Sequence, residues 1–397
     1  MRLYISREEH LRRTAQVRAE AARRGFDAVV LFNPMQVFYL TGFAFIATER
    51  PIALVVAPST TLLFVPRLEE EHATTYAAVD RVLSYPEYPS EKHPMQRLAD
   101  AMTGLTLARA RLGVDGDGYP GVMGYRGPRL SEALPQSTVT VARDMIEDMI
   151  MIKSAEEVDL IRESARWGNL AHSYLQEYTR PGAVESEVAT RASNEATSAM
   201  IRALGPDYRP LSWTFPGAHA GFRGQVGAQS AIPHAMTNNV RIRSGDVLVT
   251  GASAAVGGYI SELERTMIVG MPSSEQRRSF QLMVDMQQVA FDAIKPGRPC
   301  ADVDHAVRAF FDKHALMPYW RHHVGHALGM GIHEAPFFDI GDERLIQPGM
   351  VFSVEPGIYV PGFAGFRHSD TILVTKDGIE FLTYYPRDLE RLTIDGQ

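Results

Sequence analysis

The chain has 397 residues, of which 45% are hydrophobic and 22% charged, with a formal net charge of -7 and a pI of about 6. This mildly acidic balance, without a basic stripe, argues against nucleic acid or an anionic membrane as a partner. No run of about 18 apolar residues is present, and the charged N-terminus lacks the apolar core of a secretory signal. The single cysteine, Cys300, rules out an intramolecular disulfide, so we expect a cytoplasmic protein.

The first part of the chain predicts a small α/β domain. The charged stretch 6–24 has the pattern of an amphipathic helix that ends at Gly25. Short apolar runs follow, separated by turn residues and helical stretches: DAVVLF, IALVVAP, TLLFVP and RLGVDG. We expect this N-terminal domain to span residues 1–152.

The second domain is expected to span residues 153–397. Ser154 and Glu157 form a capping box that predicts the start of a long helix. Strand-like runs come next, interrupted by a helical stretch through QRRSFQLMVDMQQVAFDAI. Helices and strands in separate groups favour an α+β fold over a doubly wound sheet.

Carboxylates in apolar strands are the first chemical feature. In GGYISELERTMIVG, Glu262 and Glu264 are two residues apart, which places both side chains on the same face of a strand despite their repulsion. Glu355, in MVFSVEPGIYV, would be costly to bury without a metal, a substrate cation, or an arginine such as Arg265 or Arg367.

Histidines are concentrated in one segment. His322, His323, His326 and His333 all fall within RHHVGHALGMGIHEAP, whose glycines indicate a loop-rich site. His234 follows a glycine-rich loop and precedes the strand region with the glutamate pair, as a general base would. Taken alone, any of these histidines could equally be an ordinary core or surface residue.

Several motifs together resemble a known family. MIKSAEEVDLIR, PHA, GYISELERT, VGHALGMGIHEAP, SVEPGIY and GFRHSDTILVTKDG occur in the order and spacing of the M24 (pita-bread) superfamily. This superfamily includes aminopeptidase P, prolidase and creatinase, and the resemblance covers essentially the whole chain. It implies a pita-bread domain preceded by a creatinase/aminopeptidase P-like domain. It is less informative about activity, because the same fold holds metallopeptidases, metal-free hydrolases and binding modules.

The resemblance also carries a set of metal-ligand positions. Metallopeptidases of this superfamily bind two divalent ions through two aspartates, a histidine and two glutamates. The matching residues here are Gly251, Glu262, His326, Glu355 and Ser369. Because two positions lack a carboxylate, we expect no dinuclear site and no cofactor. The alternative is one weakly bound Mn, Co or Zn ion on Glu262, His326 and Glu355.

The active-site pattern resembles creatinase, the metal-free member, most closely. By that resemblance, Glu264 matches a catalytic-site glutamate, His234 a proton-shuttling histidine and Glu355 a substrate-binding glutamate. His326 and His333 match pocket-lining histidines, and we assign all five to catalysis. In this hypothesis His234 takes a proton from water, the water attacks a trigonal carbon, and the proton passes to the leaving nitrogen.

Substrate binding is assigned to Glu262, Arg50 and Arg367. Arg50 matches a creatinase arginine that reaches across a homodimer, which is why we expect a homodimer here; a surface arginine is the alternative. Two departures, Thr48 and Phe337, argue against creatine itself as the substrate.

Three functions therefore stay open. The leading hypothesis is a creatinase-like hydrolase that cleaves a C–N bond of a small amino-acid derivative without a dinuclear metal. The second is a metal-dependent Xaa-Pro aminopeptidase or dipeptidase acting on peptides. The third is a non-catalytic binding module on the same fold.

Overall fold

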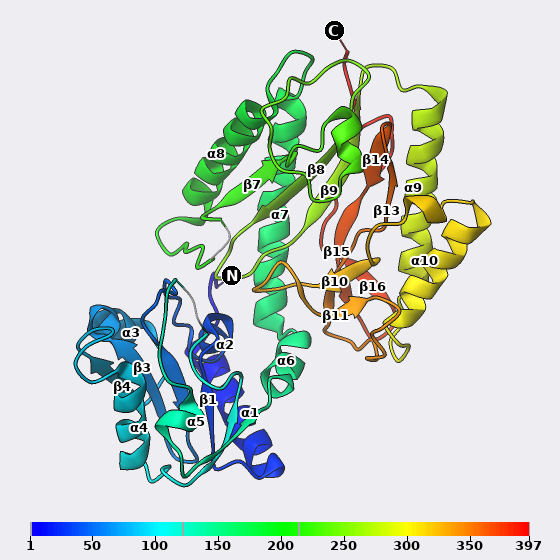
Figure 1. The fold of residues 1–397 in the computed structure, drawn as a ribbon. Helices are drawn as coiled ribbons and strands as arrows, with labels where there is room; N and C mark the ends of the chain where they lie inside the picture. Colours follow the sequence, from blue (N-terminus) through cyan, green and yellow to red (C-terminus); the bar gives the residue numbers. More distant parts are fainter. Residues whose placement is uncertain (1, 121–122, 213–214, 397) are drawn as a thin grey trace. The chain divides into compact units, whose positions relative to one another are not determined.

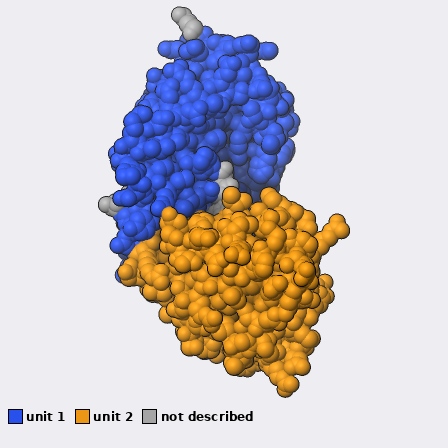
Figure 2. Space-filling model, turned by 90° about the vertical axis from the view of Figure 1, so that its left-hand side faces the viewer, with its two compact units in different colours: residues 1–4, 151–397 blue, residues 5–150 orange. Residues whose placement is uncertain are grey.

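The computed structural model describes residues 2–120, 123–212 and 215–396. Two compact units share the chain: residues 5–150 form one, and residues 1–4 with 151–397 form the other (Figure 2). Each unit combines helices with its own sheet (Figure 1), which confirms the α+β class. Within the described ranges, every helix is too short or too polar to cross a bilayer.

The unit of residues 5–150 is built on a mixed six-stranded sheet in the order β4-β3-β2-β1-β5-β6. Its strands are β1 (Ala28–Leu31), β2 (Ala53–Val56), β3 (Thr61–Pro66), β4 (Arg81–Tyr85), β5 (Arg111–Val114) and β6 (Thr138–Val141). Its helices are α1 (Arg7–Arg24), α2 (Pro34–Thr41), α3 (Glu70–Tyr76), α4 (Pro94–Gly104) and α5 (Leu130–Ala133), with a 3-10 turn η1 (Arg67–Glu69). Helix α6 (Asp144–Met151) leads out of this unit.

Helix α1 confirms the prediction made for residues 6–24. The Ser6 side chain accepts a hydrogen bond from the Glu9 amide, and Gly25 ends the helix in a left-handed conformation, with φ of 76°. The central strands are buried, and residues such as Val30, Phe64 and Leu112 form a shared apolar core with the covering helices.

The second unit is built on a nine-stranded sheet. Its main path is β11-β10-β12-β15-β9-β8-β7, with β16 paired to β15 and β17 paired to β9; β13 and β14 form a separate hairpin. The strands are β7 (Ala218–Gly221), β8 (Val247–Ala254), β9 (Leu263–Val269), β10 (Gly325–Ala327), β11 (Glu334–Phe338), β12 (Val351–Val354), β13 (Gly357–Val360), β14 (Ala364–Arg367), β15 (Ser369–Val374), β16 (Ile379–Phe381) and β17 (Thr393–Ile394).

Four long helices flank this sheet: α7 (Ala155–Tyr178), α8 (Glu185–Leu204), α9 (Ser274–Ala293) and α10 (Ala301–Lys313). Two 3-10 turns are η2 (Gly227–Ala231) and η3 (Met317–Tyr319). The predicted capping box is present at the start of α7, where Ser154 and Glu157 bond each other's backbone amides. Helices α7 and α8 pack near β7 and β8, whereas α9 packs near β12 and the β13–β14 hairpin (Figure 1).

The strand order brings distant residues together at the centre of this sheet. Four residues on adjacent strands form one continuous row of cross-strand partners, Gly221, Gly251, Glu264 and Ser369. Residues directly opposite each other in antiparallel strands point to the same face. The side chains of Glu264 and Ser369 therefore share a face that the two glycines leave open.

Strand β10 adds a histidine to this region. His326 lies opposite Ser353 on β12. A β-carbon on the preceding Gly325 would lie 2.1 Å from the Ser353 carbonyl oxygen, so only glycine permits this close approach of the two strands. The glycine next to His326 thus serves the placement of that histidine.

Candidate active site

Three predicted residues form one compact cluster. Each of Glu262, His326 and Glu355 offers a ligand atom, and these atoms lie within 4.8 Å of one another. His326 Nε2 is 3.1 Å from Glu355 Oε1 and 4.0 Å from Glu262 Oε2. His326 is fully buried, and 19% of the Glu262 side chain is exposed. Glu355 lies between β12 and β13, so the predicted single strand is interrupted there.

The charges in this cluster shift one another's proton affinity. Burial and the charge of Glu355 raise the pKa of Glu262 to about 7. Burial opposes a charged His326, but the contact with Glu355 and the charge of Glu262 outweigh it and raise the pKa of His326 to about 9. Burial would raise the pKa of Glu355, yet His326 holds it well below its usual range. The cluster therefore attracts a cation between its two carboxylates.

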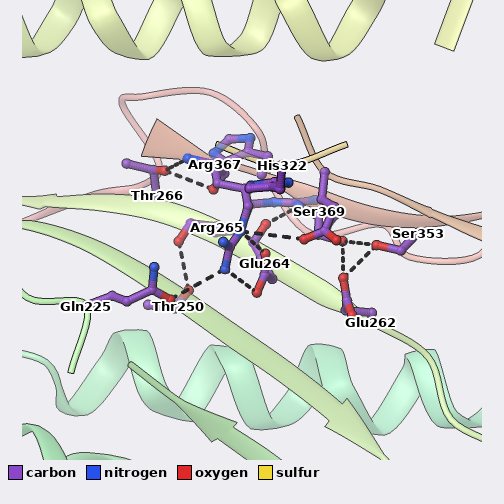
Figure 3. Close-up of polar contacts among 12 residues, drawn as sticks. Gln225, Thr250, Glu262, Glu264, Arg265, Thr266, His322, Ser353, Arg367 and Ser369 are labelled. Carbon is purple, nitrogen blue, oxygen red and sulfur yellow. Dashed lines mark hydrogen bonds and ion pairs between the residues drawn. The ribbon is translucent and has the colours of Figure 1, made fainter. Parts of the chain in front are cut away.

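Two serine hydroxyls hold the other oxygen of Glu262. Ser353 Oγ donates to Glu262 Oε1 over 2.6 Å, and Ser369 Oγ donates to the same oxygen over 2.8 Å (Figure 3). Oε2 is then left facing His326. Glu262 thus approaches His326 and not the neighbouring Arg265, which pairs with Asp370.

Glu264 forms a buried ion pair. Arg367 donates from Nε and Nη2 to the two oxygens of Glu264 (Figure 3). Arg223 Nη2 donates to Glu264 Oε1 over 2.8 Å. Arg367 Nε also lies 3.7 Å from Glu355 Oε2. Two guanidinium groups thus neutralise Glu264. Its assignment to catalysis stays a prediction, and this pairing favours a structural contribution.

A hydrogen-bonded chain continues from this ion pair toward the histidine segment. Arg367 Nη1 donates to the hydroxyl oxygen of Tyr359, which lies 2.8 Å from His322 Nε2. His322 Nδ1 is 2.8 Å from the His323 carbonyl oxygen, so Nδ1 carries the proton and Nε2 accepts from Tyr359. Burial lowers the pKa of His322, consistent with a neutral ring. These contacts fix the orientation of Arg367.

A pocket of about 240 Å³ opens beside the cluster. Glu262 and Glu264 both line it, as expected for two carboxylates on one face of the chain. Gly251 forms part of its wall, and a β-carbon there would lie 3.7 Å from Glu264 Oε1. Since Glu264 is the cross-strand partner of Gly251, its carboxylate fills the space next to the missing side chain.

The remaining predicted residues lie in three different settings. His333 stacks on His326, with ring centroids 3.9 Å apart. Burial, the charge of His326 and, more weakly, that of exposed His234 lower the pKa of His333 to about 4. Arg50 belongs to the other unit, where it pairs with Glu49 and Glu87. Its predicted reach across a dimer stays a prediction.

Arg223, Tyr359 and Ser353 were not identified from the sequence as residues of this site. Ser369 was considered only as a lost metal ligand and not as a hydrogen-bond donor to Glu262. The loop PGAHAGFRGQVGAQ was noted for its glycines, and a cation among them could have drawn attention to Arg223. The two serines give no sequence pattern, because only the register of β12 and β15 places them beside Glu262.

Comparison with known proteins identifies the family. The profile of Metallopeptidase family M24 matches residues 159–376, and that of the Creatinase/Prolidase N-terminal domain matches residues 13–152. The chain belongs to metallopeptidase family M24. The predicted pita-bread fold and the predicted hydrolase class are both confirmed by this membership.

Relatives of similar length support this membership. "Probable dipeptidase PepE" of Mycobacterium tuberculosis is 29% identical over 384 residues, covering 96% of each chain. The crystal structure of dipeptidase PepE from Mycobacterium ulcerans has a TM-score of 0.82 and 27% identity, covering 99% of this chain and 100% of that one. The prolidase structure from Pyrococcus horikoshii has a TM-score of 0.78 and 25% identity, covering 95% and 99%. These peptidase names favour our second functional hypothesis over creatinase-like hydrolysis.

The M24 family implies divalent metal, and the cluster fits one such ion. His326 Nδ1 lies 3.1 Å from the Ala327 carbonyl oxygen, which directs Nε2 at the carboxylates of Glu262 and Glu355. A histidine and two carboxylates suit Mn, Co or Zn. The expectation that no cofactor binds is therefore not supported.

A second ion does not fit the same residues. Gly251 has no ligand atom, the Ser369 hydroxyl is engaged with Glu262 and Ser353, and Glu264 is bonded by two arginines. Two adjacent dications need bridging carboxylates to offset their repulsion. Beside Gly251, the Glu264 carboxylate accepts hydrogen bonds from Arg367 and Arg223, so two positive charges already lie next to the position of a second ion.

Proposed function

We propose that the protein is a dipeptidase that hydrolyses small peptides, with one divalent ion on Glu262, His326 and Glu355. The observation that carries this proposal is the convergence of these three ligand groups within 4.8 Å, beside a pocket of about 240 Å³. Pockets for drug-sized ligands have volumes of about 300–1,000 Å³, so this one favours a smaller substrate. The names of the full-length M24 relatives support peptide hydrolysis.

The reaction consumes one water and breaks one C–N bond. The water oxygen bonds to the carbonyl carbon, and a proton from the water has to reach the leaving nitrogen. An ion bound to the cluster would polarise the scissile carbonyl as a Lewis acid. His333, which stacks on buried His326, and exposed His234 are the groups that we assign to that proton transfer. Burial lowers the pKa of His333, so its ring is neutral and can accept a hydrogen bond.

Dipeptides with a C-terminal proline are the first substrates to test, because one structural relative is named a prolidase. Purified protein would be stripped with a chelator, reloaded with Mn, Co or Zn, and assayed for amino-acid release from Xaa-Pro and other dipeptides. We expect hydrolysis that requires metal and is lost in His326→Ala and Glu355→Gln. His305→Ala, at an exposed position on α10, is the control. No release from any dipeptide at any metal level would overturn the proposal.

Metal-independent, creatinase-like hydrolysis is the second candidate. Two observations favour it. Gly251 and Ser369 lack the carboxylates of two metal-ligand positions, and Glu264 and His234 match creatinase active-site residues by resemblance. The same assay separates the two functions, because a creatinase-like enzyme would keep full activity after chelation and would cleave small amidines or amides rather than dipeptides.

Homodimer formation also stays a prediction.

A further inference from the structure

Arg223 is an arginine of the pocket wall that shares its carboxylate partner, Glu264, with a second arginine. It follows β7, has a φ of 51°, which is uncommon for a residue other than glycine, and lines the pocket. Its side chain is 47% exposed, whereas the side chain of Arg367 is 3% exposed. Of the two guanidinium groups that contact Glu264, Arg223 is therefore the one that a ligand can reach.

Only part of the Arg223 guanidinium is used within the protein. Nη2 donates to Glu264 Oε1 over 2.8 Å and to Gln225 Oε1 over 3.3 Å. Within the described ranges, its Nε and Nη1 donate no hydrogen bond to the protein. A guanidinium presents five N–H donors in one plane, so donors remain for an external acceptor.

The charges around Arg223 leave it with unmatched positive charge. Glu264 accepts from both Arg223 and Arg367, so one carboxylate faces two cations. Arg367 has a second carboxylate, Glu355, at 3.7 Å, whereas among the described residues Arg223 forms an ion pair with Glu264 alone. An anionic group in the pocket would complete the balance through charge-assisted hydrogen bonds.

The other residues of the pocket wall indicate the kind of ligand that the pocket suits. Phe215, Leu328 and Ile332 line it with apolar surface, and the two paired glycines, Gly221 and Gly251, leave room over the sheet. A small ligand with an apolar body and one anionic end matches this combination.

We propose that Arg223 binds the terminal carboxylate of the substrate and makes the enzyme selective for short peptides with a free C-terminus. This inference rests on the proposed function for the identity of the reaction. The competing explanation is that Arg223 only balances Glu264, in which case its loss affects all ligands alike.

Binding measurements test the proposal without requiring turnover. Isothermal titration calorimetry would compare N-acetyl-L-proline with N-acetyl-L-prolinamide, which differ in the carboxylate, on wild type, Arg223→Gln and Arg223→Lys. Arg191→Gln is the matched control, since Arg191 is also a half-exposed arginine paired with a glutamate. We expect wild type and the control to prefer the acid by about 10- to 100-fold, Arg223→Gln to lose the preference, and Arg223→Lys to keep part of it.

Three results would overturn the proposal: no preference in wild type, no measurable binding of the acid to wild type, or an equal preference in Arg223→Gln. Where dipeptides are hydrolysed, the same variants would raise KM for Ala-Pro but not for its amide. If dipeptide hydrolysis is absent while the acid preference disappears in Arg223→Gln, the proposed function fails and the carboxylate site stands.

Discussion

Glu264 on β9 lies directly opposite Gly251 on β8, and its carboxylate oxygen would be 3.7 Å from a β-carbon at position 251. Position 251 is where the family resemblance places a metal-binding aspartate. Ser369, the other position without a ligand carboxylate, is the partner of Glu264 on the opposite side. The two lost ligands and the added glutamate are thus neighbours in one row across three strands. We infer that the Glu264–Arg367 pair accommodates the loss of a second ion.

Restoring the family's ligands should restore the second ion. In Gly251→Asp/Glu264→Thr/Ser369→Glu, the competing carboxylate is removed and two ligands are added, so we expect close to two manganese ions per chain by mass spectrometry. Gly251→Asp alone should fail to gain an ion, because Glu264 and its arginines stay in place. A gain of a full second ion by that single variant would show that the ion pair is no obstacle.

The Glu264–Arg367 pair should contribute strongly to stability. Removing one partner of a buried ion pair leaves the other charge uncompensated, at about 3–5 kcal/mol. Glu264→Gln should therefore lower the midpoint of urea unfolding markedly, and Glu264→Gln/Arg367→Gln should cost less than the sum of the single variants. The exposed pair Arg162–Glu380 provides the control, where Arg162→Gln should cost about 0–1 kcal/mol. A near-zero effect of Glu264→Gln would argue for a carboxylate that serves substrate only.

Buried His172 should make the protein sensitive to acid. Its Nε2 lies 2.7 Å from Thr250 Oγ1, which itself donates to the Arg265 carbonyl oxygen, so Nε2 must carry the proton. Nδ1 is buried without a hydrogen bond to any described residue. Burial, with a smaller effect of the charge on Arg265, lowers the pKa of His172 to about 3.

The sign of this effect follows from proton linkage. The unfolded chain binds a proton near pH 6.5 and the folded one only near pH 3, so stability is full above pH 6.5 and is lost as the pH falls toward 3. At pH 5 the loss from this group is about 2 kcal/mol. Urea unfolding of His172→Gln should show a shallower dependence on pH between 6.5 and 4 than wild type. An unchanged slope would mean that His172 is not the group responsible.

His234 should affect turnover without affecting the cluster. It is exposed, its charge acts on His333, and it is not one of the three ligand residues. If it moves the proton between water and the leaving nitrogen, His234→Ala should lower kcat by about 10²- to 10⁴-fold while metal content and unfolding midpoint stay those of wild type. His305→Ala is the control. A kcat within twofold of wild type would remove His234 from the mechanism.

Local patterns predicted the elements well and the partners of charged groups poorly. The cap residues Ser6 and Ser154 and the stop at Gly25 act within one turn, so they could be recognised from the sequence. The grouping of Glu262, His326 and Glu355 came from motif resemblance. Periodicity alone could not show it, because strand order and register set distances between residues far apart in the chain.

The partners of the charged groups in the site also depend on strand order and register, so they could not be predicted from local sequence patterns. The sequence pointed to Glu264 as a catalytic residue and gave no sign of its two arginine partners. Strand β14 and the segment after β7 bring Arg367 and Arg223 to it from positions 103 and 41 residues away. The pocket likewise depends on the pairing of Gly221 with Gly251, which no local pattern reveals.

The number of metal ions per chain tests the central claim most directly. Wild-type protein would be stripped, reloaded with excess manganese, freed of unbound metal by gel filtration and measured by mass spectrometry, with Glu355→Gln as the control. We predict close to one ion per chain in wild type and little in Glu355→Gln. Two tightly held ions per wild-type chain would contradict the account, and so would full dipeptidase activity with none.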